Sequence, residues 1–229
     1  ITQPEEIRVK HFEDSLTCLK TGYIKDNDKI IDVGTGAGFP GLPVKFANDT
    51  LKLTLMDSLN KRLIFLGDVL SKTNTEAQLV HMRAEDGGAD VRFREKFDVA
   101  CSRAVASLCV LCEYCLPFVK VGGYFLAMKG REYEDELKSA GDIITRLGGR
   151  VKEVQMFPLS CGEIVHSIII IEKIVPTPKT YPRKGKKSEN NVEKALTNVF
   201  FSGILTKLSE KRQYINKIIS VISKKYLTN

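Results

Sequence analysis

The stretch Ile30-Ile31-Asp32-Val33-Gly34-Thr35-Gly36-Ala37-Gly38-Phe39-Pro40-Gly41 decides the fold. Its apolar beginning predicts a buried strand over 29–33, and its glycines predict a tight turn that leads into a helix. Glycine lets the backbone turn sharply and lets a ligand lie against it. Pro40 is compatible with the first turn of that helix. A strand, a glycine-rich turn and a helix in this order predict a loop that binds a nucleotide-like ligand.

Outward from this loop, short apolar runs alternate with helix-length amphipathic runs. Strands are expected over 29–33, 51–56, 79–82, 97–101 and 123–128, and helices over 42–47, 59–72, 108–118 and 133–147. This alternation is typical of βαβ units and a parallel sheet. No helix separates the runs 151–158 and 166–172, so we expect an antiparallel pair at one edge. The predicted fold is α/β, a mostly parallel Rossmann-like sheet with an antiparallel edge pair, plus a small helical segment.

The composition is that of an ordinary globular protein. Of its 229 residues, 43% are hydrophobic and 28% are charged, which excludes collagen-like, coiled-coil and wholly disordered chains. Lys and Arg number 35 against 28 Asp and Glu, and the resulting charge of +7 weakly favours a polyanionic partner. We find neither a signal peptide nor an apolar run as long as a membrane span. We therefore expect a cytoplasmic protein without a membrane anchor.

Two ligand patterns overlap in the glycine loop. Gly36-x-Gly38-x-x-Gly41 matches the dinucleotide fingerprint, in which pyrophosphate lies at a helix N-terminus. Asp32-x-Gly34-x-Gly36-x-Gly38 matches a loop that binds S-adenosylmethionine (SAM). Asp32 discriminates between them, because a carboxylate is unfavourable beside pyrophosphate and favourable beside the ammonium and sulfonium of SAM. We favour SAM, with a dinucleotide and a purely structural turn as the alternatives.

Polar residues follow the next three predicted strands. Asp57 can accept hydrogen bonds from both ribose hydroxyls of a nucleoside, or can act as a helix N-cap. Ala84 and Glu85 follow the third strand, where an adenine amino group would lie, and Arg103 follows the fourth. Ligands bind at the carboxyl ends of parallel strands, so we expect these segments to meet in one crevice.

Several spaced motifs together resemble the RsmG (GidB) family, the bacterial 16S ribosomal RNA guanine-N7 methyltransferases. The resemblance covers about residues 1–185. The motifs are His11-Phe12-x-Asp14-Ser15-Leu16, the glycine loop 32–41, Asp57-Ser58-Leu59-x-Lys61-Arg62, Ser102-Arg103-Ala104, Lys129-Gly130 and Tyr181-Pro182-Arg183-Lys184.

The resemblance implies a class I SAM-dependent methyltransferase that acts on N7 of a specific guanine in 16S rRNA of the small ribosomal subunit. We expect a monomer with SAM as its cofactor and no metal. The cofactor-binding residues are expected to be Asp32, Gly34, Gly36, Gly38, Phe39, Asp57, Ala84, Glu85 and Arg103. The alternatives are a SAM-dependent methyltransferase for another RNA or a small molecule, a nonenzymatic RNA-binding factor and, least favoured, a nicotinamide oxidoreductase.

Guanine N7 already carries an available lone pair, so catalysis needs positioning rather than a general base. Arg103 and Lys129 are the candidate catalytic residues, since each can hydrogen-bond guanine O6 or a phosphate. The alternative for both is a salt bridge across the crevice. His11 and Asp14 are expected to flank the pocket, with His11 as a structural residue rather than an acid or base.

The chain becomes basic after the core. We divide it into a methyltransferase core over 1–175, a basic linker or arm over 176–191 and a two-helix segment over 192–229. Tyr181 is a candidate for stacking on an unpaired base. The arm is expected to bind RNA phosphates electrostatically, or else to be a merely mobile arm, through Lys179, Arg183, Lys184, Lys186 and Lys187.

The two-helix segment resembles the helices with which the family begins. Joining Asn229 to Ile1 restores a continuous sequence that is similar to the family's entry into its core. We therefore expect a circularly permuted order, arising by engineering, by nature or by assembly of the sequence. A plain C-terminal extension is the alternative.

Three of the six cysteines follow the pattern Cys109-x-x-Cys112-x-x-Cys115. With a fourth ligand from elsewhere, three thiols can hold a metal cluster. The spacing also places them on roughly one face of an apolar helix, where cysteine behaves as a small buried hydrophobe. We favour burial.

Overall fold

The computed structural model describes residues 7–103, 106–160 and 165–183, and the strands in these ranges form one seven-stranded sheet of order β3-β2-β1-β4-β5-β7-β6. β1 to β5 run parallel, β7 is antiparallel to β5, and β6 is antiparallel to β7. The predicted mostly parallel sheet with an antiparallel edge pair is confirmed. The bounds are β1 (Lys29–Val33), β2 (Lys52–Asp57), β3 (Gln78–His81), β4 (Phe97–Ser102), β5 (Val119–Lys129), β6 (Gly149–Pro158) and β7 (Val165–Lys173).

β5 is the one strand whose predicted start is wrong by more than two residues. It begins at Val119 rather than at 123, and the three residues after Val119 are exposed, which hid this part of the strand from the apolar pattern. The pairing of β4 with β5 shifts register between Phe97 and Val99. The polar and glycine residues of 120–123 are typical of a turn in the sequence, although their backbone belongs to the strand.

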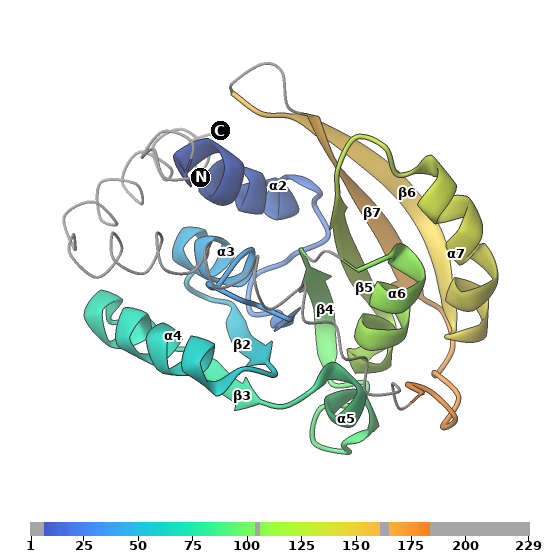
Figure 1. Cartoon of the computed structure of the whole chain (residues 1–229), viewed down its shortest axis with the longest axis horizontal. Helices are drawn as coiled ribbons and strands as arrows, with labels where there is room; N and C mark the ends of the chain where they lie inside the picture. Colours follow the sequence, from blue (N-terminus) through green and yellow to red (C-terminus); the bar gives the residue numbers. More distant parts are fainter. Residues whose placement is uncertain (1–6, 104–105, 161–164, 184–229) are drawn as a thin grey trace.

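Helices cover both faces of the sheet (Figure 1). In Figure 1, α2, α3 and α4 lie on one side of the sheet, and α5, α6 and α7 lie on the other. The bounds are η1 (Arg8–Glu13, a π-helix), α2 (Asp14–Lys20), α3 (Gly41–Ala47), α4 (Asn60–Thr73), α5 (Ala84–Ala89), α6 (Leu108–Cys115), η2 (Leu116–Phe118, a 3-10 helix) and α7 (Glu134–Arg146).

Two apolar cores form, one on each face of the sheet. Alternate residues of a strand point to opposite faces, and β1 shows this directly. Ile30 packs in the core with α3 and α4, while Ile31 packs in the core with α6 and α7, and both are fully buried. Burial on both faces explains why the parallel strands read as short continuous apolar runs.

The short helix α5 has no helical apolar pattern and was not predicted as a helix. Its sequence contains two glycines, Gly87 and Gly88. A Cβ at Gly87 would lie 2.8 Å from Met56 Cε and 3.0 Å from Phe118 Cζ. Glycine is therefore required here because α5 packs directly on the sheet and η2.

The chain changes direction across the sheet between β1 and β4. β1 pairs with β2 on one side and with β4 on the other, so the order runs outward from β1 first one way and then the other. In open α/β sheets, ligands bind beyond the carboxyl ends of the strands at such a switch point. We refer to the region beyond the ends of β1, with its glycine loop, and of β4 as the crevice, because the switch point predicts a ligand there.

Residues 174–183, here called the strap, leave β7 and return along α5 and α6. The Arg94 guanidinium donates to the carbonyl oxygens of Gly88 (2.7 Å), Thr177 (2.6 Å), Pro178 (3.1 Å) and Tyr181 (2.9 Å). The strap is therefore anchored at Thr177 and Pro182, which are buried, while most of its other residues are exposed.

Lys173, the last residue of β7, supports the fold from inside. Its side chain is fully buried, and its Nζ donates to the carbonyl oxygens of Leu116 and Val119 and to Thr177 Oγ1 at 2.6 Å. Burial lowers the pKa of Lys173 to about 8. The rest of the predicted arm, 184–191, and the predicted two-helix segment, 192–229, lie outside the described residues.

None of the helices formed by the residues that the structure describes is long and apolar enough to cross a membrane.

Replacing Arg94 by Met should destabilise the fold, because several carbonyl oxygens lose a charged donor at once. We expect the free energy of unfolding in urea to fall by about 3 kcal/mol. Arg92→Met is the matched control, since Arg92 is largely exposed and pairs only locally with Asp90; its unfolding midpoint should stay near that of the original chain. Equal midpoints for the two variants would contradict a clamping role for Arg94.

Candidate functional site

The glycine loop bends over the end of β1 through three residues with positive φ. The φ angles are 72° at Gly34, 60° at Gly36 and 93° at Gly38, in the region that favours glycine. The backbone N–H groups of Gly34 and Thr35 donate to the Met56 carbonyl at 2.9 and 3.0 Å, which ties the loop to β2. A Cβ built on Gly34 would meet no atom within 4 Å. The loop therefore presents bare backbone to open space at the switch point.

Asp32 lies beneath this loop and is fully buried. Its Oδ2 accepts hydrogen bonds from Thr35 Oγ1 at 2.7 Å and from the Gly41 N–H at 2.9 Å. Burial raises the pKa of Asp32 to about 6. The carboxylate therefore braces the loop from inside, and its predicted role toward the cofactor stays a prediction.

Asp57 ends β2 and is also buried, with its carboxylate turned toward the glycine loop. Its Oδ2 accepts the Gly36 N–H at 3.0 Å, and its Oδ1 accepts the Leu59 N–H at 2.9 Å. Arg62 Nη1 lies 3.0 Å from Oδ2. Asp57 thus joins the loop to Leu59, the residue before α4, and is not the N-cap of that helix.

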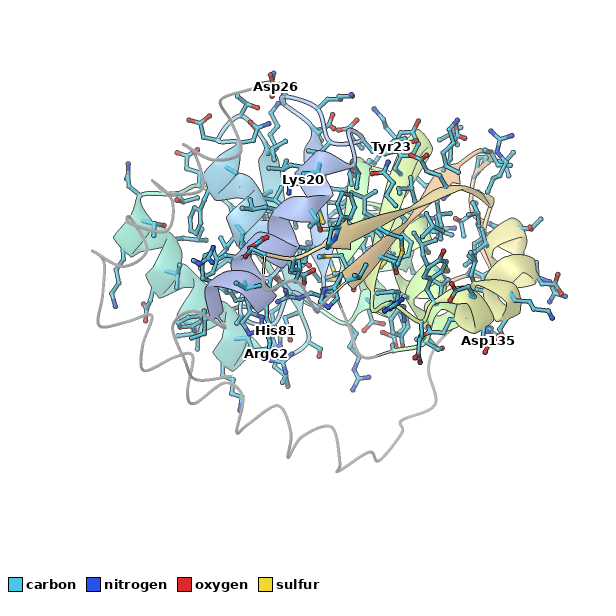
Figure 2. All side chains as sticks on the ribbon, turned by 90° about the horizontal axis from the view of Figure 1, so that it is seen from above. Lys20, Tyr23, Asp26, Arg62, His81 and Asp135 are labelled. Atoms are coloured by element: carbon cyan, nitrogen blue, oxygen red, sulfur yellow. The ribbon has the colours of Figure 1, made fainter. Side chains whose placement is uncertain are left out.

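Figure 2 shows Arg62 and His81 close together, far from Asp26 at the top of the view. His81 pairs in register with Asp57 at the carboxyl ends of β3 and β2. Ala84 and Glu85 begin α5, directly after β3, as the sequence predicted. Burial and the neighbouring Glu85 carboxylate raise the pKa of Tyr114, so Glu85 faces α6. The predicted segments do meet at one edge of the sheet.

Arg103 follows β4 and is held by the N-terminal helices. Its Nη1 lies 2.9 Å from Asp14 Oδ2 and 3.2 Å from the Lys10 carbonyl, and its Nη2 lies 3.1 Å from His11 Nδ1. The Arg103 side chain is 22% exposed. The predicted salt-bridge alternative is therefore present, and part of the Arg103 side chain remains accessible to solvent.

Phe39 joins the loop to these helices. Its ring stacks on His11 with centroids 5.1 Å apart, meets Phe12 edge-on at 5.2 Å, and lies 5.1 Å from the Arg103 guanidinium carbon. Burial, and then Arg103, lower the pKa of His11 to about 4. His11 is thus a neutral hydrogen-bond acceptor for Arg103, in line with the structural role predicted for it.

Lys129, the second candidate catalytic residue, is engaged by the loop before α6 and by α7. Its Nζ donates to the Ala106 carbonyl at 2.8 Å and to Glu136 Oε2 at 2.7 Å, and its side chain is 8% exposed. The same carboxylate oxygen accepts the Leu108 N–H. Lys129 therefore ties the loop before α6 to α7, which is the salt-bridge alternative.

The candidate RNA-binding residues are only partly within the described chain. Lys179 is exposed. Arg183 donates to both oxygens of Glu113, with its Nη2 2.7 Å from Oε2, and lies over the Tyr181 ring at 5.6 Å. Lys184, Lys186 and Lys187 lie outside the described residues. The end of the strap is thus anchored on α6.

Two of the clustered cysteines, Cys112 and Cys115, are fully buried on α6, as predicted, and burial raises the pKa of both thiols. Cys109 is partly exposed. Among the described residues, no group of three or more His, Cys, Asp and Glu side chains is placed to hold a metal ion.

Sequence reasoning missed two polar partners at the site. Glu136 on α7 holds Lys129, and His166 at the start of β7 lies with its Nδ1 2.6 Å from Asp14 Oδ1. His166 lies 152 positions from Asp14, so no local motif marks the pair. A polar side chain inside the apolar strand run 165–173 was the one signal that could have drawn attention to it.

Comparison with known proteins adds to this geometry. The model of the GidB family, described as rRNA small subunit methyltransferase G, matches residues 1–165. The chain belongs to the GidB family. Ribosomal RNA small subunit methyltransferase G of Alkaliphilus metalliredigens is 52% identical over 185 residues, which cover 80% of this chain and 77% of the relative. The protein of the same name from Thermoanaerobacter sp. is 50% identical over the same shares of both chains.

Solved structures share the fold at low sequence identity. TYW2 of P. horikoshii, in complex with MeSAdo, gives a TM-score of 0.54 at 13% identity and covers 70% of this chain and 61% of that one. A SAM-dependent O-methyltransferase of Thermotoga maritima gives 0.52 at 14% identity and covers 72% and 66%. The GidB chain thus has the class I SAM-dependent methyltransferase fold, as predicted.

The residues present fit the SAM on which the family depends. In the described part of the chain, Asp32 Oδ1 is buried without a hydrogen-bond partner, two residues before Gly34 in the same loop. An unsatisfied anionic oxygen there favours a cationic ligand and disfavours pyrophosphate. The predicted cofactor is therefore supported by the charge of the cradle as well as by its shape.

A methyl group added at Gly34 should weaken SAM binding. In Gly34→Ala the Cβ projects into the open cradle, and we expect the Kd for SAM to rise about tenfold or more, measured by calorimetry. Gly22→Ala is the matched control, because Gly22 also has a positive φ of 77° and open space around its Cβ. Both variants carry the same backbone strain, so both should lose similar thermal stability. Equal SAM affinities for the two would place the ligand elsewhere.

The neutral His11 should make stability depend on pH. The unfolded chain takes up a proton near pH 6.5, whereas folded His11 resists it down to about pH 4, so the unfolded state binds more protons in this window. The free energy of unfolding therefore falls as pH drops from about 6.5 to about 4, by about 2 kcal/mol at pH 5.

Comparison with His11→Asn isolates this contribution, because Asn keeps an acceptor for Arg103 and cannot titrate. The difference in unfolding free energy between the two chains should shrink by that amount between pH 7.5 and pH 5. A constant difference would mean that His11 titrates normally in the folded protein.

Proposed function

We propose that this chain transfers the methyl group of SAM to N7 of a specific guanine in 16S rRNA of the small ribosomal subunit. The observation that carries the proposal is the open backbone at Gly34, with the buried Asp32 carboxylate in the same loop and the partly exposed Arg103 on a neighbouring strand end. The chain that holds this arrangement belongs to the GidB family. The cradle suits the methyl donor, and Arg103 lies on the neighbouring strand end, where an acceptor would meet it.

The chemistry asks little of the protein beyond placement. When bound, SAM supplies an activated methyl carbon on a sulfonium centre. The N7 lone pair forms the new bond to carbon as the bond to sulfur breaks, so positive charge moves onto the purine and no proton has to be removed first. The protein's contribution is to hold the attacking and leaving atoms in line about 3 Å apart.

Each side chain at the crevice has a part in this placement. Asp32 fixes the glycine loop, and Asp57 fixes the segment before α4. Once its present hydrogen bonds rearrange, the Asp57 carboxylate can accept hydrogen bonds from the ribose hydroxyls of SAM. Arg103 is the residue that we assign to the acceptor, through guanine O6 or a phosphate. We assign Lys129 a bracing role toward Glu136 instead of a catalytic one.

RNA binding is the role that we propose for the basic residues beyond the core. Arg183 anchors the end of the strap on Glu113, and Lys179, Lys184, Lys186 and Lys187 then contact phosphates. Such contacts position the RNA without reading its sequence.

The test is transfer of labelled methyl from SAM to small ribosomal subunits that lack native methylation, with the product mapped by digestion and mass spectrometry. We expect label in 7-methylguanine at one position of 16S rRNA. Label at another atom or in another RNA would contradict the proposed specificity, and no label despite measured SAM binding would contradict the substrate.

The same assay tests the arm. A chain with Gln at positions 179, 184, 186 and 187 should lose affinity for the subunit and show a shallower dependence of that affinity on salt, while SAM binding stays unchanged. An unaltered salt dependence would remove the arm from the RNA interface.

A further inference from the structure

Asp14 is a buried carboxylate that connects two strand ends at the crevice. Its side chain is 1% exposed, its Oδ2 lies 2.9 Å from Arg103 Nη1, and its Oδ1 lies 2.6 Å from His166 Nδ1. Both oxygens are therefore engaged, one by a residue following β4 and the other by a residue of β7. A carboxylate fixed in this way sets the position of the guanidinium and the imidazole together.

The two groups lie at the end of β4 and at the start of β7, the strands on either side of β5. β7 is antiparallel to β5, and Ser167 pairs with Lys129, so the start of β7 lies at the same edge of the sheet as Arg103. The glycine cradle lies on the other side of β4, at β1. A methyl donor in the cradle would thus face an acceptor held between Arg103 and His166.

His166 offers an unused hydrogen-bonding atom in this position. Its side chain is 29% exposed, and among the described residues its Nε2 has no hydrogen-bond partner. Because Nδ1 donates its hydrogen to the Asp14 carboxylate, Nε2 of the neutral ring carries a lone pair. His11 cannot play this part, since it is 6% exposed and its Nδ1 already accepts from Arg103.

Guanine presents the complementary pattern next to the atom that is methylated. Its O6 accepts, and the adjacent N1 carries a hydrogen; adenine has a donor at the 6-position and an acceptor at N1, which is the reverse. We propose that His166, held by Asp14, accepts the N1–H of the target guanine at Nε2 while Arg103 donates to O6. The inference rests on the proposed function and names the residues that select guanine over adenine.

The same hydrogen bond assists the reaction. As the methyl group reaches N7, the purine becomes positively charged and its N1–H becomes a stronger donor. The bond to His166 is therefore stronger in the transition state than in the bound substrate, and only such an interaction raises kcat. Asp14 acts through His166 and Arg103 and is a positioning residue.

The variant His166→Asn separates recognition of the guanine base by Nε2 from the structural contact between Nδ1 and Asp14. Asn keeps a donor near the position of Nδ1 for Asp14 and removes the acceptor at Nε2. We expect kcat for methylation of the small subunit to fall about tenfold or more, with the melting temperature and the Kd for SAM close to those of the original chain. His166→Ala should be impaired at least as much.

Subunits reconstituted with 1-methylguanine at the target position supply the decisive comparison. The original chain should lose about tenfold in kcat on this substrate, because the N1–H is gone, whereas His166→Asn should lose no further activity. Asp14→Asn should lower kcat more than His166→Asn with SAM binding kept. Glu13→Gln is its matched control, since Glu13 is a neighbouring buried carboxylate that binds Ser160 instead, and it should keep full kcat.

Three results would overturn the inference. Full activity in His166→Asn alongside a defective His166→Ala would reduce His166 to a structural tie. Losses that multiply in His166→Asn with the 1-methylguanine substrate would show that the two groups do not meet. Failure of the original chain to make 7-methylguanine in unmodified subunits would overturn the proposed function itself, and is recognised separately because it requires no variant.

Discussion

The hydrogen bonds from Thr35 and the Gly41 N–H to Asp32 are the constraint on which the rest of the site depends. One carboxylate oxygen collects donors from both ends of the glycine loop, so the loop closes around the end of β1. Close packing adds a second constraint on the loop. A Cβ at position 41 would lie 2.9 Å from Asp32 Oδ2, so only glycine allows this close approach. The start of α3, the open face at Gly34 and the seat of Phe39 are all set by this one buried group.

Cations that are buried or half-buried hold the remaining parts of the site in place. Arg103 joins β4 to the N-terminal helices, Lys129 joins the loop before α6 to α7, and Lys173 joins β7 to η2. A buried charge is tolerated only when it is paired or well hydrogen-bonded, and each of these is. The positive charge of the chain is therefore not all available to a polyanion, since part of it supports the fold.

Much of the fold could be predicted from local pattern, and much of the site could not. β1 was predicted with its exact bounds, because a buried strand followed by glycines leaves a clear local signal. The partners of the site's cations were not predictable in the same way: Asp14 lies 89 positions from Arg103, and His166 lies 152 positions from Asp14. Spacing along the chain reports on one element at a time, whereas these pairs exist only because the sheet brings distant strand ends together.

The strap shows how a tether can persist while its sequence changes. Arg94 holds it entirely through main-chain carbonyl oxygens, at Thr177, Pro178 and Tyr181, and every amino acid supplies such an oxygen. The hydrogen bonds from Arg94 therefore depend on the course of the backbone and not on most of the side chains of the strap. Evolution can alter the exposed residues of this segment freely, and so retune the outer surface beside α5 and α6, without releasing it from the body of the enzyme.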